Sequence, residues 1–305
     1  MKVFITGSGG LVGHSILDNS MIAKNRLLTP RSSELDLMDF KKVFDFIQEH
    51  MPDMIIHCAG KVGGIQANME NMFGFYTENA VMGINLVRAA RQCGVKKMIN
   101  LSSSCTYPRN YLQPLKEEYI LKSELEPTNE GYALAKLSVL KMCEYISNEC
   151  KGFEYKSLIP CNLYGKYDKF DERHAHMIPS IIRKIHNAKV SGKDSVEIWG
   201  DGESRREFMY VEDLADCVEF CIENWEKVPL VMNVGLGYDY TVNEYYEVIK
   251  SILNYDGSFT HDLSKPAGMR QKLLDISKTR EIGWEAKTSL EEGIKKTYEF
   301  YMETL

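Results

Sequence analysis

The chain has 305 residues and a formal net charge of −6, from 37 Lys plus Arg and 43 Asp plus Glu. This length accommodates one large or two medium domains with a buried core. The negative charge argues against nucleic-acid or membrane partners recognised through a basic surface, and no run of about 18 uncharged apolar residues could span a bilayer.

Short apolar runs alternate with longer helical patterns through the first half of the chain. The alternation is typical of βαβ units and predicts an α/β fold with a Rossmann-type, doubly wound parallel sheet. The helical patterns are clearest at 40–47, after Asp39, and from about Tyr76 to Cys93. The predicted strands are Val3–Thr6, Arg26–Thr29, Met54–Cys58, Lys97–Leu101 and Tyr155–Ile159.

Beyond Gly165 the pattern changes to a charged loop at 166–174, a helix from Ile178, a strand at Val196–Trp199 and another at Arg206–Tyr210. We therefore predict a dinucleotide-binding domain at 1–165 and a smaller C-terminal α/β substrate domain at 166–305. A segment near 207–237, which contains the apolar run Leu230–Val234, is expected to return to the first domain. The loop at 166–174 is a candidate lid.

The eight cysteines lie singly, mostly within apolar periodic segments, as expected of reduced thiols rather than disulfides. Cys217 and Cys221 have the spacing of a metal-ligand pair, but their apolar neighbours favour a buried helix face, so we expect no metal. The first residues, Met1–Gly7, enter an apolar run without a recognisable secretion signal. A cytoplasmic location is expected.

A glycine turn follows the first predicted strand directly and opens a predicted helix. In Rossmann folds such a turn lets the backbone approach a pyrophosphate, which then meets the unpaired N–H groups of the helix N-terminus. A plain strand-to-helix connection is the alternative. The predicted phosphate-binding residues are Gly7, Ser8, Gly10, Leu11, Val12 and Gly13.

The end of the second predicted strand indicates which dinucleotide binds. An NAD site carries Asp or Glu about 20 residues after the glycine turn, but here the strand ends in Thr29-Pro30-Arg31. A guanidinium suits a 2′-phosphate, so we favour NADP(H) over NAD(H), with a solvated surface Arg31 as the alternative. Asp36, Leu37 and Ala59 complete the expected cofactor contacts.

Tyr132 and Lys136 form a Y-x-x-x-K motif on a predicted helix, where four-residue spacing places both side chains on one face. A tyrosine that exchanges a proton near neutral pH needs a neighbouring cation, because a free phenol has a pKa near 10. Ser103, at the end of the fourth predicted strand, would share the same carbonyl oxygen. This constellation predicts reduction of a ketone.

The glycine turn, Ser103 and the Tyr132–Lys136 pair together resemble the extended short-chain dehydrogenase/reductases. More narrowly, the chain resembles the GDP-L-fucose synthase family over nearly its whole length. Five sequence blocks in order carry that resemblance: 61–65 (KVGGI), 103–108 (SSCTYP), 127–132 (PTNEGY), 162–165 (NLYG) and 176–179 (HMIP).

The resemblance implies a GDP-4-keto-6-deoxymannose 3,5-epimerase/4-reductase. It implies Ser103, Tyr132 and Lys136 for reduction, and Cys105 with His176 for epimerisation. The chemistry is coherent, because a C4 ketone acidifies the neighbouring C–H bonds, so a thiolate can remove a proton and an imidazolium can return one to the opposite face. The alternatives are a buried, unreactive Cys105 and a His176 that merely begins a helix.

The resemblance also implies a homodimer, paired through the helices at 76–93 and 132–150, and five residues that bind the nucleotide-sugar. A diphosphate needs cations and donors, and an indole can pack against a base or sugar. A surface ion pair with Glu207 is the alternative role for Arg205 and Arg206. The implied substrate residues are Asn162, Arg183, Trp199, Arg206 and Lys272.

The chain departs from the family at 166–170, where KYDKF replaces the common Pro-His-Asp-Asn-Phe, and at 58–60. Another GDP-4-keto sugar, either a 6-deoxyhexose or a heptose, therefore stays open. So does a C4-reductase that follows a separate epimerase. A dehydratase or 4-epimerase fits less well, because Ser104 and Cys105 stand where dehydratases carry Asp-Glu. An NADP-binding regulator would not need the Tyr132–Lys136 pair.

Overall fold

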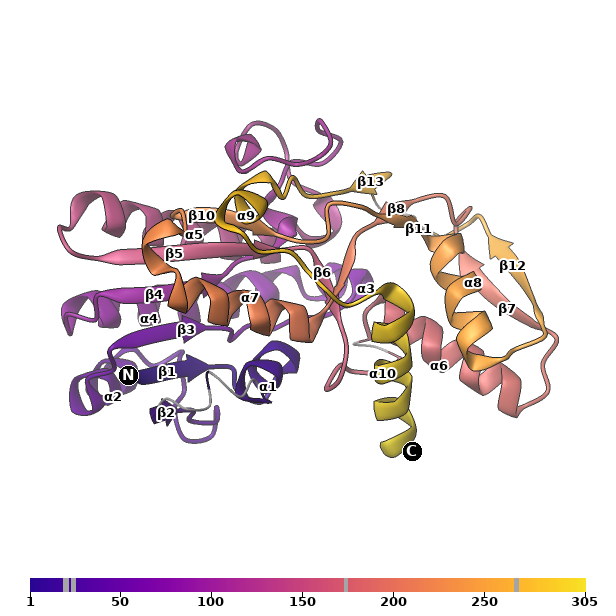
Figure 1. Ribbon diagram of the computed structural model, residues 1–305, viewed down its shortest axis with the longest axis horizontal. Helices are drawn as coiled ribbons and strands as arrows, with labels where there is room; N and C mark the ends of the chain where they lie inside the picture. The colour runs from indigo at the N-terminus through magenta and orange to yellow at the C-terminus, as the bar shows by residue number, and fades with distance from the viewer. Residues whose placement is uncertain (19–21, 23–25, 173–174, 266–268) are drawn as a thin grey trace.

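The computed structural model describes residues 1–18, 22, 26–172, 175–265 and 269–305, so positions 173–174 of the predicted lid lie outside the described residues. Figure 1 shows a large sheet flanked by helices, with a second group of elements beyond its carboxyl edge. The α-helices are α1 (Leu11–Asp18), α2 (Phe40–His50), α3 (Ile65–Glu70), α4 (Met72–Gln92), α5 (Glu130–Glu149), α6 (Met177–Val190), α7 (Val211–Glu223), α8 (Val242–Leu253), α9 (Ser277–Ile282) and α10 (Leu290–Glu303). Short 3₁₀ helices are η2 (Ser104–Thr106), η3 (Glu117–Tyr119), η4 (Pro127–Asn129) and η5 (Trp225–Lys227).

The large sheet has six parallel strands in the order β10-β5-β4-β3-β1-β2. The predicted Rossmann-type parallel sheet is thus confirmed, and the run at 230–234 joins it as β10, paired with β5. Strand order reverses between β1 and β3, where a doubly wound sheet binds its ligand. The strands are β1 (Lys2–Thr6), β2 (Arg26–Leu28), β3 (Met54–His57), β4 (Lys97–Leu101), β5 (Glu154–Pro160) and β10 (Val231–Val234).

Side chains of the central strands alternate between two buried faces, as strand geometry requires. Phe4 and Ile55 join the hydrophobic cluster formed with α2, α4 and α5. Val3 and Ile56 join the cluster formed with α1 and α7 on the opposite face. Helices on both faces leave the strand carboxyl ends as the edge where polar side chains can gather.

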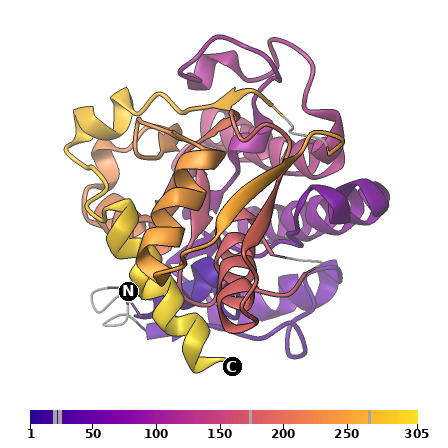
Figure 2. The same ribbon diagram turned by 90° about the vertical axis from the view of Figure 1, so that its right-hand side faces the viewer.

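A separate hydrophobic core lies in the second half of the chain, built from α6, α8, α10 and several short strands. Figure 2 faces this end of the molecule and shows α8 and α10 beside the strand pair β7–β12. The short strands form three small sheets: β6 (Asn162–Tyr164) with β9 (Phe208–Tyr210), β7 (Ser195–Trp199) with β12 (Ser258–Asp262), and β8 (Arg205–Arg206) with β11 (Tyr240–Thr241) and β13 (Gln271–Lys272).

Two predicted elements differ in the structure. The run Arg206–Tyr210, predicted as one strand, is divided between β8 and β9, which belong to different sheets. The division falls at Glu207, whose backbone carbonyl accepts the Asn162 side-chain amide at 2.9 Å and whose buried carboxylate accepts the backbone N–H groups of Leu236 and Leu274. Helix α4 begins at Met72, earlier than predicted, because the Asn71 side chain caps it by accepting the Gly74 N–H at 3.1 Å.

All eight cysteines are free thiols, and Cys217 and Cys221 are fully buried on α7. Within the described residues, no group of three or more His, Cys, Asp and Glu side chains is arranged to hold a metal ion. Among the helices formed by those same residues, none has the length and apolar character needed to cross a membrane.

Buried His57 makes the fold sensitive to acid. His57 ends β3 and shares a 2.8 Å hydrogen bond with the Thr6 hydroxyl, and burial followed by the charge of Lys136 lowers the pKa of His57 from 6.5 to about 3. Below pH 6.5 the unfolded chain binds a proton that the folded chain rejects, so stability is lost as the pH falls from 6.5 toward 3. At pH 5 the loss is about 2 kcal/mol.

We expect His57→Gln to remove this contribution from the difference in urea-unfolding free energy between pH 7.5 and pH 5. The exposed His261 supplies the matched control, His261→Gln. Equal pH dependence in the wild type and both variants would contradict the prediction.

Candidate active site

The glycine turn between β1 and α1 lies at the point where strand order reverses. Gly7 has a φ of +70°, and a Cβ at Gly7 would lie 2.6 Å from the backbone N of Ala59, which follows β3. A Cβ at Gly13 would lie 2.2 Å from the Gly7 carbonyl oxygen. These two positions require glycine for backbone packing. A Cβ at Gly10 would lie 3.5 Å from the Gly7 carbonyl oxygen, an ordinary van der Waals contact, so packing of the described residues does not require glycine there. Gly10 immediately precedes α1, whose N-terminus can receive a pyrophosphate.

The other predicted cofactor residues surround this turn. Ser8 is buried, and its hydroxyl donates to the Thr29 carbonyl at 3.4 Å at the end of β2. Arg31 is exposed, and its backbone N–H donates to the Glu34 carboxylate at 2.7 Å. The Arg31 guanidinium forms no ion pair with the described residues. Asp36 accepts the Met38 N–H, whereas Leu37 is buried in the core beside α2. The hydrogen bond between Ser8 and Thr29 thus places the glycine turn beside the end of β2.

Ser103, Tyr132 and Lys136 come together at the end of β4. Ser103 precedes η2, and both Tyr132 and Lys136 lie in the first half of α5. The Lys136 ammonium donates to the Leu101 carbonyl at 3.0 Å and lies 5.9 Å from the centroid of the Tyr132 ring. The three side chains predicted for reduction thus share one site.

The electrostatics of this trio are set mainly by burial. Burial raises the pKa of Tyr132, the Cys105 thiol raises it further, and a hydrogen bond from Ser103 lowers it. Burial also lowers the pKa of Lys136 to about 8, and the Cys58 thiol opposes that shift. Tyr132 therefore stays a protonated donor at neutral pH, beside an ammonium that stabilises the phenolate once the proton has left.

The Cys105 thiol lies in the same site with two donors of its own. Its sulfur accepts the Asn129 amide at 3.3 Å and lies 3.8 Å from the Lys272 ammonium. Asn129 ends η4, immediately before α5, and Lys272 comes from β13. A partly exposed thiol with a cation and an amide donor matches the surroundings of reactive cysteines, and the reactivity of Cys105 stays a prediction.

His176 precedes α6, and its side chain makes no capping bond to that helix. Its Nδ1 lies 3.4 Å from Oδ1 of Asp168, a buried carboxylate. The neighbouring Ala175 carbonyl lies 3.4 Å from the position that a Cβ at Gly64 would occupy. Gly64 begins α3, which packs against η4, where Asn129 contacts Cys105. A series of contacts through α3 and η4 thus links the segment that carries His176 to the Cys105 thiol.

The five predicted substrate residues do not all lie together. Asn162 donates to the Glu207 carbonyl at 2.9 Å, and burial lowers the pKa of the half-buried Arg206, near Cys105. Trp199 is half exposed, between the Lys184 and Lys265 ammonium groups. Arg183 lies on α6, with its Nε buried and without a hydrogen bond among the described residues. Arg206 and Lys272 thus lie near the Cys105 thiol, whereas Arg183 lies on α6 and Trp199 at the end of β7.

The NAD dependent epimerase/dehydratase family matches residues 3–235 of the chain. GDP-L-colitose synthase of Yersinia pseudotuberculosis is 53% identical over 302 residues, which are 99% of this chain and 98% of that protein. GDP-L-fucose synthase of Azorhizobium caulinodans is 45% identical over 301 residues, which are 99% of this chain and 96% of that protein. The chain belongs to the NAD dependent epimerase/dehydratase family.

A solved member of similar architecture is a GDP-mannoheptose C4 reductase from Campylobacter jejuni with NADP bound. It superposes with a TM-score of 0.89 at 31% identity, covering 99% of this chain and 98% of that one. The resemblance to GDP-L-fucose synthases predicted from the five sequence blocks is confirmed by the full-length relatives.

Sequence reasoning missed three polar residues of this epimerase/dehydratase site. Asn129 was part of a quoted block, three residues before Tyr132, but its contact with Cys105 depends on how η4 turns into α5. Asp168 stood in the loop that departs from the family. Glu207 was considered as a surface partner of Arg205, but Arg205 pairs with Asp239 at 2.7 Å. Only its apolar neighbours at 208–210 could have signalled that Glu207 is buried.

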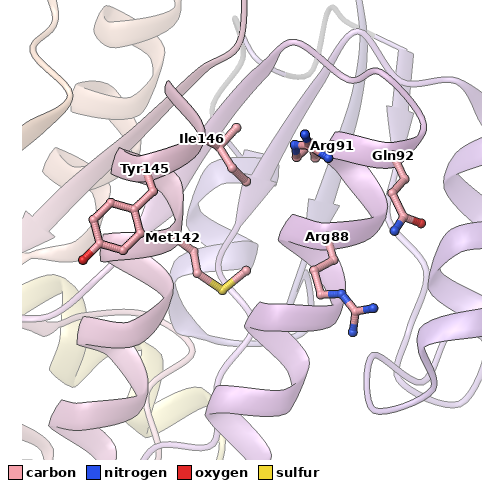
Figure 3. Close-up of a pocket in the computed structure, with 6 residues that line it drawn as sticks. All are labelled: Arg88, Arg91, Gln92, Met142, Tyr145 and Ile146. Carbon is pink, nitrogen blue, oxygen red and sulfur yellow. The ribbon is translucent and has the colours of Figure 1, made fainter. Parts of the chain in front are cut away.

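A surface hollow of about 330 Å³ lies between α4 and α5, on the side facing away from the sheet. Figure 3 shows its lining, with the aliphatic side chains of α5 opposite the arginines of α4. None of the predicted catalytic residues lines it. The lining residues are Arg88, Arg91, Gln92, Met142, Tyr145 and Ile146.

Proposed function

We propose that this protein is an NADPH-dependent enzyme that epimerises a GDP-4-keto-6-deoxy sugar at C3 and C5 and then reduces its C4 ketone. The observation that carries the proposal is the joint placement of the Cys105 thiol and the Ser103–Tyr132–Lys136 trio at one strand edge. The bound sugar would thus meet a base for its C–H bonds and donors for its carbonyl oxygen in the same place.

The NADP(H) site fits the residues present. Gly7 and Gly13 close the turn tightly, while Gly10 immediately precedes α1. Arg31 would hold a 2′-phosphate, and Asp36 with Leu37 would border the adenine. When bound, NADPH supplies the hydride for C4. Full-length likeness to an NADP-bound reductase supports this choice of dinucleotide.

Epimerisation would use Cys105 and His176 in turn. The C4 ketone acidifies the C3 and C5 hydrogens, and the Cys105 thiolate removes one, leaving the electron pair as an enolate on C4–O. Tyr132 and Ser103 would donate hydrogen bonds to that oxyanion. His176 then delivers a proton to the opposite face of the same carbon. Once the Cys105 thiol has lost its proton to solvent and the His176 imidazole has regained one, the same cycle at the other carbon completes both inversions.

Reduction would use the same oxygen contacts. As the hydride reaches C4, the Tyr132 hydroxyl transfers its proton to the carbonyl oxygen while Ser103 keeps that oxygen in place. The Lys136 ammonium, which donates to the Leu101 carbonyl, stabilises the phenolate that remains. A hydroxyl group at C4 is the product. Both reactions thereby depend on donors that are already arranged around one oxygen.

The second half of the chain would hold the GDP portion. We assign 166–305, without the segment near 207–237, to this substrate domain, because the residues of α6, α8 and α10 form a hydrophobic core separate from those of the large sheet. Leu274, Ile276 and Trp284 of the same range pack instead with the large sheet. Arg183 and Trp199 would contact the nucleotide end. Lys272, implied by the resemblance as a substrate residue, is near the Cys105 sulfur and therefore suits the sugar end.

We also propose a cytoplasmic homodimer that pairs through α4 and α5. Their outer face carries the hollow of Figure 3 and exposes Tyr76 and Tyr145, so a second copy would cover apolar surface there. The eight free thiols agree with a reducing compartment.

A C4-reductase without epimerase activity is the second candidate. Two observations favour it: the likeness to a GDP-mannoheptose C4 reductase, and the loop at 166–170, which departs from the GDP-L-fucose synthase pattern next to His176. In that case the substrate would be another GDP-4-keto sugar, such as a heptose.

The deciding experiment incubates the protein with GDP-4-keto-6-deoxymannose and NADPH in heavy water, with NADH in parallel. NADPH consumption with deuterium at C3 and C5 and GDP-L-fucose as product supports the proposal. Consumption without carbon-bound deuterium supports the reductase alone. No turnover would reject this sugar and direct the same assay to GDP-4-keto-heptoses.

Arg31 provides a test of the cofactor assignment. We expect Arg31→Ala to weaken NADPH binding by about tenfold, because one charge-assisted contact with the 2′-phosphate is lost, and to leave NADH binding unchanged. Fluorescence titration of both dinucleotides measures the effect, and Lys41→Ala, at an exposed cation of α2, is the control. Equal weakening of NADPH and NADH binding would contradict the assignment.

A further inference from the structure

Asp168 is a buried carboxylate that the mechanism above does not use. Its side chain is only 4% exposed, whereas the neighbouring His176 side chain is 35% exposed. Oδ1 accepts the Lys169 N–H at 2.8 Å and lies 3.4 Å from His176 Nδ1. Oδ2 is also buried and has no hydrogen bond among the described residues. Since a buried carboxylate needs polar partners, the imidazole at Oδ1 is, among the described side chains, the one placed to donate to it.

This contact determines which ring nitrogen of His176 can face a substrate. When Nδ1–H donates to the carboxylate, Nε2 lies on the opposite side of the ring and is left for proton transfer. The Asp168 carboxylate is buried, whereas the His176 imidazole is partly exposed. The arrangement is that of a carboxylate which orients a general acid without touching the substrate itself.

Tyr167 attaches the loop that carries Asp168 to the cofactor-binding helix. Its backbone has a φ of +67°, which is unfavourable for a non-glycine residue, so other contacts must hold it there. The hydroxyl donates to Asp18 Oδ2 at 2.8 Å, and the ring stacks on His14 with centroids 4.4 Å apart. The ring also meets Phe300 edge-on at 5.1 Å. His14 and Asp18 both belong to α1, the helix that begins at the glycine turn.

We propose that Asp168 is a positioning residue for His176, and that Tyr167 fixes the Asp168 loop against α1. The inference deepens the proposed function, because it rests on His176 being the acid of the epimerisation. Tyr167 stands in the segment where this chain departs from the GDP-L-fucose synthase pattern, so this attachment is a feature of the present sequence.

The proposal predicts a pattern of isotope exchange that distinguishes a positioning role of Asp168 from a loss of folding. If His176 is misoriented, the Cys105 thiol still removes a proton, exchanges it with solvent and returns it to the same face. With NADP⁺ in heavy water, and therefore without reduction, Asp168→Asn should give deuterated starting sugar with unchanged configuration. The rate of inversion should fall about 100-fold, which is within the range for loss of a general acid. His176→Asn should give the same signature, and Asp168→Glu should restore part of the inversion.

The reverse reaction supplies the internal control. Oxidation of GDP-L-fucose by NADP⁺ needs the Ser103–Tyr132–Lys136 trio but no inversion, so it should stay within about twofold of wild type in Asp168→Asn. Glu172→Gln, at an exposed carboxylate of the same loop, should leave both inversion and oxidation unchanged. Tyr167→Phe, which keeps the ring but removes the bond to Asp18, should lower inversion by about fivefold, as expected for one lost charge-assisted bond.

The outcomes are distinct. Wild-type inversion in Asp168→Asn, or equal loss of exchange, inversion and reverse oxidation in both Asp168→Asn and Tyr167→Phe, would overturn the positioning role. A wild-type protein that neither exchanges nor inverts would instead reject the proposed epimerase function on which the inference rests.

Discussion

Tyr132→Phe should lower the rate of NADPH oxidation with the keto sugar by about 1000-fold, within the range for loss of a general acid. The phenol is the donor whose proton reaches the C4 oxygen, and burial raises its pKa, which keeps it protonated at neutral pH. The phenyl ring preserves packing on α5, so folding should not change. Deuterium exchange at the carbon atoms should continue at a reduced rate, because Cys105 and His176 remain but the enolate oxygen loses one of its two donors.

Stopped-flow absorbance of NADPH measures the reduction, and mass spectrometry of the sugar measures the exchange. Tyr145→Phe is the matched control, since Tyr145 lies on the same helix but is half exposed on its outer face. Reduction at the wild-type rate in Tyr132→Phe would show that another group donates the proton.

Cys105→Ala should lower deuterium uptake at both C3 and C5 by about 1000-fold, because the proposed mechanism assigns proton removal at both carbons to the Cys105 thiolate. Oxidation of GDP-L-fucose by NADP⁺ should persist, since the trio that performs it is intact. Removing the thiol also frees the Asn129 amide and the Lys272 ammonium, which both face its sulfur. We therefore expect this variant to bind the product sugar slightly differently but to oxidise it.

Cys93→Ala is the matched control, because the Cys93 thiol is partly buried at the end of α4, where its contact is with the Phe44 carbonyl. Exchange should be unchanged there. If Cys105→Ala still took up deuterium at either carbon, that carbon would have a different base. If Cys93→Ala lost as much deuterium exchange as Cys105→Ala, the loss would not depend on the position of the Cys105 thiol.

Local sequence patterns were sufficient for the elements that build the large sheet. The predicted strand at 97–101 is β4 residue for residue, and the others differ by one or two residues at an end. Their apolar runs are buried on both faces, so hydrophobicity alone specifies them. The helical spacing of Tyr132 and Lys136 was equally local, and the structure places both beside Ser103.

The boundary between β8 and β9 depends on contacts with distant segments, so local sequence patterns did not predict it. Arg206–Tyr210 has an apolar character throughout its second half, but the buried carboxylate of Glu207 accepts the N–H groups of Leu236, Gly237 and Leu274. These donors come from distant segments, so the local sequence around Glu207 did not predict that its carboxylate is buried. Burial outweighs those bonds and raises the pKa of Glu207 to about 7.

The candidate site shows the same difference between features that local motifs predict and contacts that form across the fold. The glycine turn and the Y-x-x-x-K pair belong to short motifs whose chemistry follows from residue type and spacing, whereas the roles of the Cys105 thiol and the His176 imidazole were implied by the family resemblance. Only the tertiary structure decided that Lys272, 167 residues from Cys105, would meet its sulfur, and that Asp168 would support His176. Those contacts join separate parts of the chain, and packing of the whole fold, rather than local spacing, determines such distances.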